Sequence, residues 1–263
     1  MEVIVRLSVF FGILIGMLVW EAWRPTRRLQ LQRLQRWTVN LGLALFNVLV
    51  MRISVGAAAW QASIWAAEQP LGLFNVLILP SWLSIAGSLL LLDLAIYAQH
   101  VAAHRWRWFW RLHQVHHTDI DFDATTAVRF HPLEIMLSMA YKVMLVLLLG
   151  AQPMAVIMFE VILNGCALFN HGNVSLPGGW EKHLRYLLVT PDMHRIHHSA
   201  RPIETDSNYG FSLSCWDRLF KTYTAQAQLP QTEMTIGLNG FREPNELGFF
   251  GLLALPFRRL RLR

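Results

Sequence analysis

The sequence predicts an all-α protein, a multi-pass membrane helical bundle with a cytoplasmic, histidine-rich helical cap. The first reason is composition: 54% of the 263 residues are hydrophobic and 15% are charged, with a mean hydropathy of +0.34. Soluble domains usually carry about 25% charged residues. The second reason is a series of long apolar runs, and the third is that all eleven histidines lie at or beyond His100.

The first expected helix covers residues 3–20, a nearly unbroken apolar run that contains Arg6. No small-residue cleavage site follows this run. A basic stretch with Arg24, Arg27 and Arg28 comes instead. We therefore predict a retained transmembrane helix rather than a secretory signal peptide.

Further spans are expected because about 20 apolar residues cross the hydrocarbon core of a bilayer. The candidate runs are residues 38–60, 80–98, 133–149 and 153–169. The last two are shorter and read as a helical hairpin, whose full crossing of the bilayer stays open. Residues 61–79 are ambiguous, since Glu68, Gln69 and Pro70 interrupt a moderately apolar segment.

Basic residues indicate the orientation of these helices. Lysine and arginine gather between residues 24 and 36, between 105 and 129, and beyond 169, while the links 61–79 and 150–152 contain none. Positively charged segments stay in the cytoplasm, so the N-terminus is expected outside and the histidines inside. We expect an integral protein of a bacterial inner membrane. The net charge of +6 then reflects topology and anionic headgroups, and no nucleic-acid partner is predicted.

The histidines fall into three boxes. His100 and His104 are four residues apart, which places both rings on one face of a helix. Each of the other two boxes combines spacings of three and four residues. They comprise His113, His116 and His117, and His194, His197 and His198.

Local sequence supports a helix for each box. The first box continues the run 80–98 beyond its membrane end. The third box follows Thr190, Pro191 and Asp192, which supply a capping hydroxyl, a first-turn proline and an acid favoured by the helix dipole. The two cysteines, Cys166 and Cys215, are far apart and predict neither a disulfide nor a thiolate metal site.

Eight box histidines exceed the three or four ligands of a single zinc ion. Neutral imidazole binds Fe, Zn, Cu and Ni. The number suits two metal ions a few ångströms apart. Beside a membrane the substrate is expected to be apolar, with C–H bonds that water does not attack.

These motifs resemble the fatty acid hydroxylase and sterol desaturase superfamily, over about half of the chain. The family's HxxxH, HxxHH and HxxHH pattern corresponds to the three boxes. Its other elements match at residues 129–134 (Arg-x-His-Pro-x-Glu), 169–173 (Phe-x-His-x-Asn), 208–210 (Asn-Tyr-Gly) and 216–223. Lys221 stands where the family usually has glycine, which questions the local turn.

The resemblance implies a di-iron centre that uses O2 and external electrons to hydroxylate or desaturate a sterol, fatty acyl, carotenoid or related lipid. Two Fe ions are the expected cofactors, and Zn can occupy the site in purified protein because the Irving–Williams order favours it. We expect a separate electron donor, such as a ferredoxin or cytochrome with its reductase. Residues 80–225 are the expected catalytic domain, between transmembrane helices at 1–79 and a basic cytoplasmic tail at 226–263.

The resemblance adds His171 as a ninth ligand. His131 has two interpretations, as a tenth ligand or as a hydrogen-bonding group of its own turn. Candidates for orienting ligands are Asp93, Asp192, Asn170 and Asn208, and Asp93 could equally pair with an arginine for packing. No catalytic residue separate from the ligands is expected.

Three other classes compete with the oxygenase. A zinc hydrolase of the membrane would need a glutamate base as in HExxH, and neither HxxHH box has one. A non-enzymatic metal-binding membrane protein would place ligands inside the bilayer path. A haem protein would leave most of these histidines unexplained.

Overall fold

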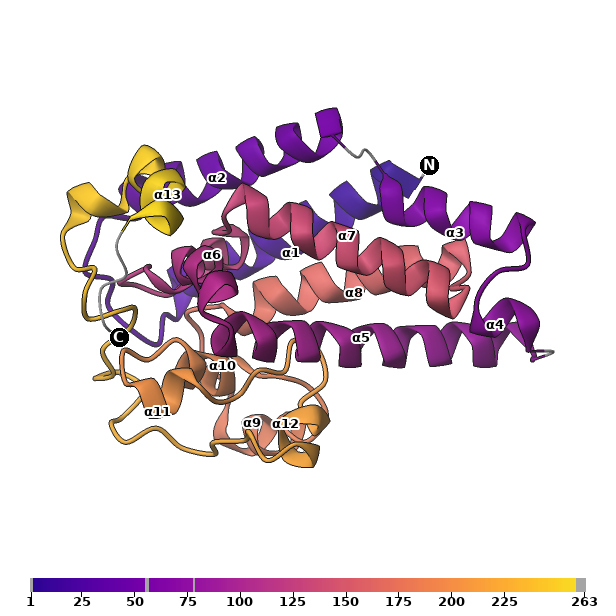
Figure 1. Cartoon of the computed structure of the whole chain (residues 1–263). Helices are drawn as coiled ribbons and strands as arrows, with labels where there is room; N and C mark the ends of the chain where they lie inside the picture. The colour runs from indigo at the N-terminus through magenta and orange to yellow at the C-terminus, as the bar shows by residue number, and fades with distance from the viewer. Residues whose placement is uncertain (1, 55–56, 78, 259–263) are drawn as a thin grey trace.

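The computed structural model describes residues 2–54, 57–77 and 79–258. In these ranges the chain is helical and forms no β-strand beyond isolated bridges, which confirms the all-α prediction (Figure 1).

Five stretches are long and apolar enough to cross a membrane. They are Val3–Trp23, Arg33–Val76, Ser81–Arg105, Pro132–Leu149 and Pro153–Asn170. The long helices within them are α1 (Glu2–Trp23), α2 (Arg33–Ser54), α5 (Ser81–Arg105), α7 (Pro132–Leu149) and α8 (Pro153–Asn170). α8 packs against α1 and α5, and α7 packs against α2. The chain is therefore a multi-pass membrane protein.

The apolar run 38–60 falls within the candidate span Arg33–Val76, and two helices share the run. α2 ends at Ser54 and α3 (Ala58–Glu68) begins after a gap whose residues 55 and 56 lie outside the described ranges. α3 departs from the line of α2 because it packs against α7 and α8, where Ala59 is buried beside Val146 and Val156.

The ambiguous segment 61–79 contains the end of α3, a turn and the short α4 (Leu73–Val76). Gly72 in the turn has a φ of +92° and lies against Gly150, the left-handed residue that ends α7. A Cβ atom at Gly72 would meet the Gly150 nitrogen at 2.1 Å, so this contact requires glycine. The two links without basic residues thus touch each other at one end of the bundle.

Arg6, the charge within the first apolar run, is paired inside the bundle. Its guanidinium lies 2.6 Å from Glu160 on α8, and the amine of Lys142 on α7 donates to the same carboxylate at 2.8 Å. The pairing joins three helices and lowers the cost of these charges in an apolar environment.

The histidine-rich cap gathers at the opposite end of the bundle (Figure 1). Its short helices are α6 (Arg107–His117), η1 (Ala124–Val128), α9 (Gly178–Leu184), α10 (Pro191–His197), α11 (Pro202–Thr205) and α12 (Cys215–Leu219). The structure continues through η2 (Pro244–Leu247), α13 (Phe249–Ala254) and η3 (Leu255–Phe257).

The expected C-terminal tail packs into the cap in its described part. Leu238, Phe241, Leu252 and Leu255 belong to one buried cluster with Leu43 of α2 and with α6. Residues 234 and 236 lie in a second cluster beside α10. Buried apolar contacts therefore hold this region against the cap. From the sequence it was expected only as a basic tail.

Candidate metal centre

Four elements of the structure bring nine histidines together. α5 carries His100 and His104 on its last turns, and α6 carries the second box. His171 directly follows α8, and the third box lies on α10 and the residue after it. None of the nine is more than 6% exposed.

The nine rings divide into two groups whose ligand atoms lie within 4.8 Å of one another. One group contains His100, His104, His113, His117 and His197. The other contains His116, His171, His194 and His198. Each group has enough nitrogens to hold one metal ion.

The hydrogen bonds of the Nδ1 atoms fix which ring nitrogen faces inward. Nδ1 of His100 lies 2.8 Å from the Tyr209 carbonyl, and Nδ1 of His171 lies 2.7 Å from the Ala167 carbonyl. Nδ1 of His197 makes the same contact with the Ser207 carbonyl. A carbonyl oxygen only accepts, so Nδ1 carries the hydrogen and the Nε2 lone pair is directed into the group.

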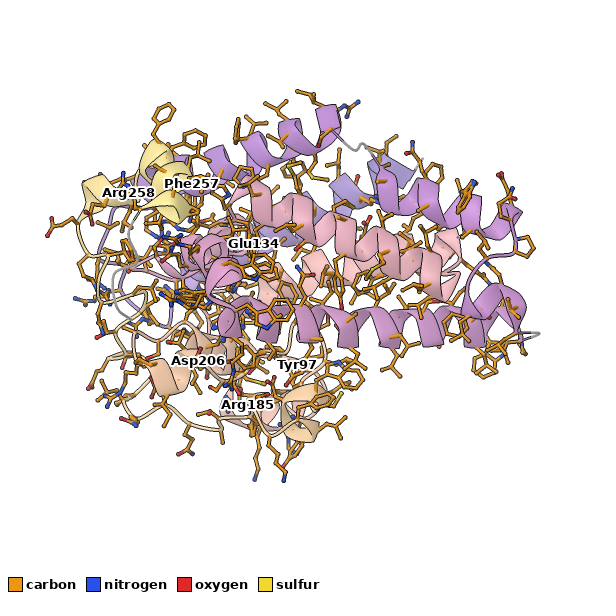
Figure 2. All side chains as sticks on the ribbon, viewed as in Figure 1. Tyr97, Glu134, Arg185, Asp206, Phe257 and Arg258 are labelled. Carbon is orange, nitrogen blue, oxygen red and sulfur yellow. The ribbon has the colours of Figure 1, made fainter. Side chains whose placement is uncertain are left out.

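Two carboxylates act in the same way. Glu134 on α7 accepts from Nδ1 of His113 at 2.6 Å, and Asp206 accepts from Nδ1 of His104 at 3.2 Å. Figure 2 shows Glu134 and Asp206 on opposite sides of the cap end of α5. A carboxylate behind a metal-ligating imidazole fixes the ring and raises its basicity.

The inward nitrogens crowd one another in a way that suits a cation. Nε2 of His117 lies 3.1 Å from Nε2 of His104 and 3.2 Å from Nε2 of His113. Because both partners hold their hydrogen on Nδ1, the three nitrogens share at most one hydrogen. In the second group, Nε2 of His171 lies 3.1 Å from Nε2 of both His116 and His194. A metal ion between such lone pairs turns repulsion into coordination.

His198 gives independent evidence for a ligand. Both of its ring nitrogens are buried and have no hydrogen-bond partner in the described protein. Its ring stacks on that of His117, with ring centroids 4.5 Å apart. A buried polar nitrogen without a partner is costly, so the residues present fit a metal-bound state.

Burial keeps these imidazoles neutral. Desolvation, followed by the positive charge that neighbouring rings would carry, holds the pKa values of His116, His117, His194 and His198 well below the usual histidine range. Burial lowers the pKa of His171 to about 4. Neutral imidazole is the form that binds metal, so the site is ready for a cation at pH 7.

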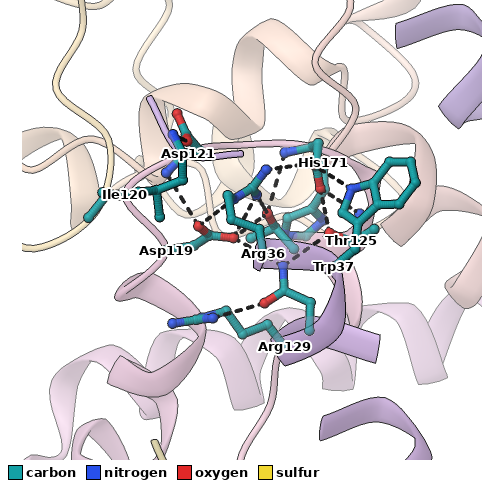
Figure 3. Close-up of polar contacts among 12 residues, drawn as sticks. Arg36, Trp37, Asp119, Ile120, Asp121, Thr125, Arg129 and His171 are labelled. Carbon is teal, nitrogen blue, oxygen red and sulfur yellow. Dashed lines mark hydrogen bonds and ion pairs between the residues drawn. The ribbon is translucent and has the colours of Figure 1, made fainter. Parts of the chain in front are cut away.

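A buried ionic network holds the segment that follows the second box (Figure 3). Arg36 of α2 donates to both carboxylate oxygens of Asp119, at 3.0 and 2.7 Å, and also to Asp123. Burial alone would raise the pKa of Asp119, but the guanidinium of Arg36 outweighs it and holds that pKa below its usual range. Arg129 joins the network through Asn40, at 2.8 Å.

The four candidates for orienting ligands bond to backbone and to other side chains instead. Asp93 accepts from the Trp216 indole at 2.8 Å, and Asp192 accepts from Arg195 at 2.7 Å. Asn170 donates to the Phe211 carbonyl at 2.9 Å. Asn208 donates to the carbonyls of Met193 and Thr224. These bonds hold segments that carry the histidines.

His131 lies outside both groups. It is the N-cap of α7, where its Nδ1 accepts from the Leu133 amide at 3.2 Å, and its Nε2 lies 3.2 Å from the Leu253 carbonyl. This geometry matches the second of its two interpretations, a hydrogen-bonding group of the Arg-x-His-Pro turn.

Several supporting residues were missed by sequence reasoning. Glu134 belongs to the matched Arg-x-His-Pro-x-Glu element, which was a usable signal. Asp206 and Arg36 carry no local signal because they meet their partners only through the fold. The same holds for Arg195, whose buried guanidinium donates to the carbonyls of Gly172 and Val174 just after His171.

Comparison with known proteins finds a family model and several relatives that are similar to this sequence. A family model described as fatty acid hydroxylase matches residues 85–222. An ornithine lipid hydroxylase of Rhizobium tropici is 27% identical over 81% of this chain and 59% of its own length. The human alkylglycerol monooxygenase is 28% identical over 62% of this chain and 35% of its own length.

A cholesterol 25-hydroxylase-like protein of Danio rerio is 27% identical over 71% of this chain and 73% of its own length. The chain thus spans between a third and three fifths of the first two relatives, and more of the third. No solved structure is significantly similar to this chain.

Proposed function

Because the chain belongs to the fatty acid hydroxylase family, we propose that it is a membrane-bound di-iron oxygenase that hydroxylates or desaturates a lipid with O2 and electrons from a separate donor. The observation that carries this proposal is the pair of buried histidine groups, five and four rings respectively, beside a transmembrane helix. Nine neutral imidazoles exceed the needs of one ion and supply two.

We assign one iron to each group. Iron bound there would supply the redox chemistry with O2 that an unactivated C–H bond requires. The protein's own contribution is positional: Glu134, Asp206 and three backbone carbonyls hold the Nδ1 hydrogens, so that Nε2 of each ring is presented inward. Phe130 stacks on His116 at 4.4 Å and Phe122 on His171 at 5.6 Å, which fixes ring planes and excludes water.

The membrane helices and the relatives support a proposal for the substrate class. Two of the relatives are named for an ornithine lipid and an alkylglycerol, and both compounds carry apolar chains. We propose that this chain acts on a membrane lipid of that kind, or on a sterol. The basic segments lie on the histidine side, so we propose a cytoplasmic site.

The test is metal content on protein expressed with iron and purified without oxygen. We expect about two irons per chain. A His194→Ala/His198→Ala variant should lose iron, whereas His183→Ala, which removes an exposed histidine outside both groups, should keep it.

Activity is then measured on bilayer lipids with O2 and a reductase system, by mass spectrometry of the extracted lipids. Products that carry one added oxygen, or that lack two hydrogens, support the proposal. One metal or none, unchanged in the double variant, would overturn it. If aerobically purified protein contains zinc, the iron content of the anaerobically purified protein decides the test.

A further inference from the structure

One edge of the cap exposes a group of large apolar side chains. Tyr186, Leu187, Leu219 and Phe220 are between 50% and 66% exposed, and we call these four residues the α12 patch. The segments that carry these residues meet, because the amide of Ser214, just before α12, donates to the Leu187 carbonyl at 3.1 Å. Exposed apolar side chains gathered in this way mark an interaction site more often than scattered ones do.

The position of the α12 patch along α5 indicates what covers it. The Phe220 ring stacks on Tyr97 of α5, with ring centroids 5.4 Å apart. Tyr97 lies in the last turn of the apolar run 80–98 that is expected to span the membrane, so Phe220 lies near the membrane end of that run.

The patch therefore lies beside the transmembrane helix rather than beyond its end. Asp93, one turn further along α5, accepts from the Trp216 indole of α12 at 2.8 Å. In Figure 1, α12 lies alongside the cap-proximal part of α5, and Figure 2 shows Tyr97 on the side of α5 that faces it. Since α5 has the length and composition of a membrane span, a side chain at this depth meets lipid.

Basic side chains flank the α12 patch. Lys182 on α9 and Lys221 next to Phe220 are both exposed. Lys221 has a φ of +59°, the left-handed conformation that glycine adopts without strain. The glycine-favouring turn is thus kept although a lysine occupies it. A long amine at this position can reach anionic headgroups while its stem lies along apolar surface.

We propose that the α12 patch inserts into the bilayer leaflet on the histidine side, which makes this edge of the cap an interfacial lipid-binding surface. The inference rests on the chain being a membrane protein and is independent of the oxygenase proposal. Asp217 of α12 accepts from the Tyr209 amide at 2.7 Å, and the Tyr209 carbonyl orients His100. The inserted segment is therefore linked to the metal centre through a single short stretch of backbone.

The test uses the full chain in lipid vesicles, with Cys166→Ser and Cys215→Ser to remove the native thiols. Leu219→Cys is labelled with an environment-sensitive fluorophore and quenched by phospholipids that carry a nitroxide near the headgroup or deep in the acyl chain. We expect a blue-shifted emission and stronger quenching by the shallow nitroxide than by the deep one.

Two matched positions calibrate the result. Ile203 on α11 is 73% exposed, and a label at Ile203→Cys should remain unquenched. Leu90 within α5 is 46% exposed, and a label at Leu90→Cys should respond to the deep nitroxide. Quenching of the label at 219 no greater than at 203 would overturn the proposal and leave the patch as a surface for a protein. Because the readout is lipid contact, it does not depend on iron or on activity.

Discussion

Oε1 of Glu134 lies 2.6 Å from Nδ1 of His113, and this contact joins the second histidine box to the first turn of a transmembrane helix. The carboxylate holds the hydrogen on Nδ1 and so directs the Nε2 lone pair into the five-histidine group. It would also compensate part of the positive charge of a bound metal ion, which neutral imidazole ligands leave uncompensated.

Glu134→Gln should weaken metal binding at the five-histidine group. Removal of an outer carboxylate typically lowers metal affinity by about 10–100-fold. The measurement is iron retention against a graded chelator series. Glu233→Gln, an exposed glutamate, is the control and should behave as wild type. Equal retention in the two variants would show that Glu134 does not orient a ligand.

Arg195→Ala should destabilise the four-histidine group and the fold together. Arg195 is fully buried and ties α10 to the carbonyls of Gly172 and Val174. Loss of its hydrogen bonds should cost on the order of 3 kcal/mol in the free energy of unfolding. Thermal unfolding in detergent measures this. Arg195→Lys should not restore stability, because an amine cannot reproduce the forked donors. Arg201→Ala, on the surface, should be near neutral.

Arg36→Met should destabilise the protein by about 3–5 kcal/mol, because Asp119 and Asp123 would remain buried without their cation. The double variant Arg36→Met/Asp119→Asn should recover part of this loss, since one of the two charges is then removed. Chemical unfolding of both variants provides the test. A double variant less stable than the single one would contradict the ionic network as the cause.

Metal-free protein should lose stability as the pH falls from about 6.5 toward 4. The pKa of His171 in the folded chain is about 4, below the value near 6.5 of an unfolded histidine. Unfolded chains therefore take up a proton in this window while folded chains do not. The stability contributed by the neutral ring is complete above pH 6.5 and is lost as the pH falls through the folded pKa.

The unfolding temperature of chelator-treated protein at pH 7 and pH 5 measures this effect. His171→Gln should show a smaller difference between the two pH values than wild type. The difference in wild type should also shrink after iron is restored, because a bound cation competes with the proton. A pH-independent unfolding temperature in metal-free wild type would contradict the neutral buried state.

His131→Ala should keep the metal and lose stability. The ring caps α7 and contacts the Leu253 carbonyl, away from both groups. Loss of a side-chain N-cap costs about 0.5–2 kcal/mol. Iron content and thermal unfolding are measured together, with His171→Ala as the variant expected to lose iron. Iron loss in His131→Ala equal to that in His171→Ala would restore His131 to the ligand set.

The sequence was sufficient for most of the long helices and for the histidines that gather in the cap. A spacing of three and four residues puts histidines near one another on any helix, and Thr190 and Pro191 marked where α10 begins. Long apolar runs located the membrane helices, except where α3 turns away from α2. That turn depends on contacts of α3 with α7 and α8, which no local pattern records.

Only the tertiary structure decided how the histidines divide. His116 and His117 are neighbours in the chain but face different groups, because successive residues on a helix are about 100° apart. His113 with His117, and His194 with His198, each share a group at a spacing of four, while His116 and His197 face the other one. Glu134, Asp206 and the carbonyl of Tyr209 complete the site from distant segments. The sequence alone determined which rings are available, and the packing of four elements determined where each Nε2 points.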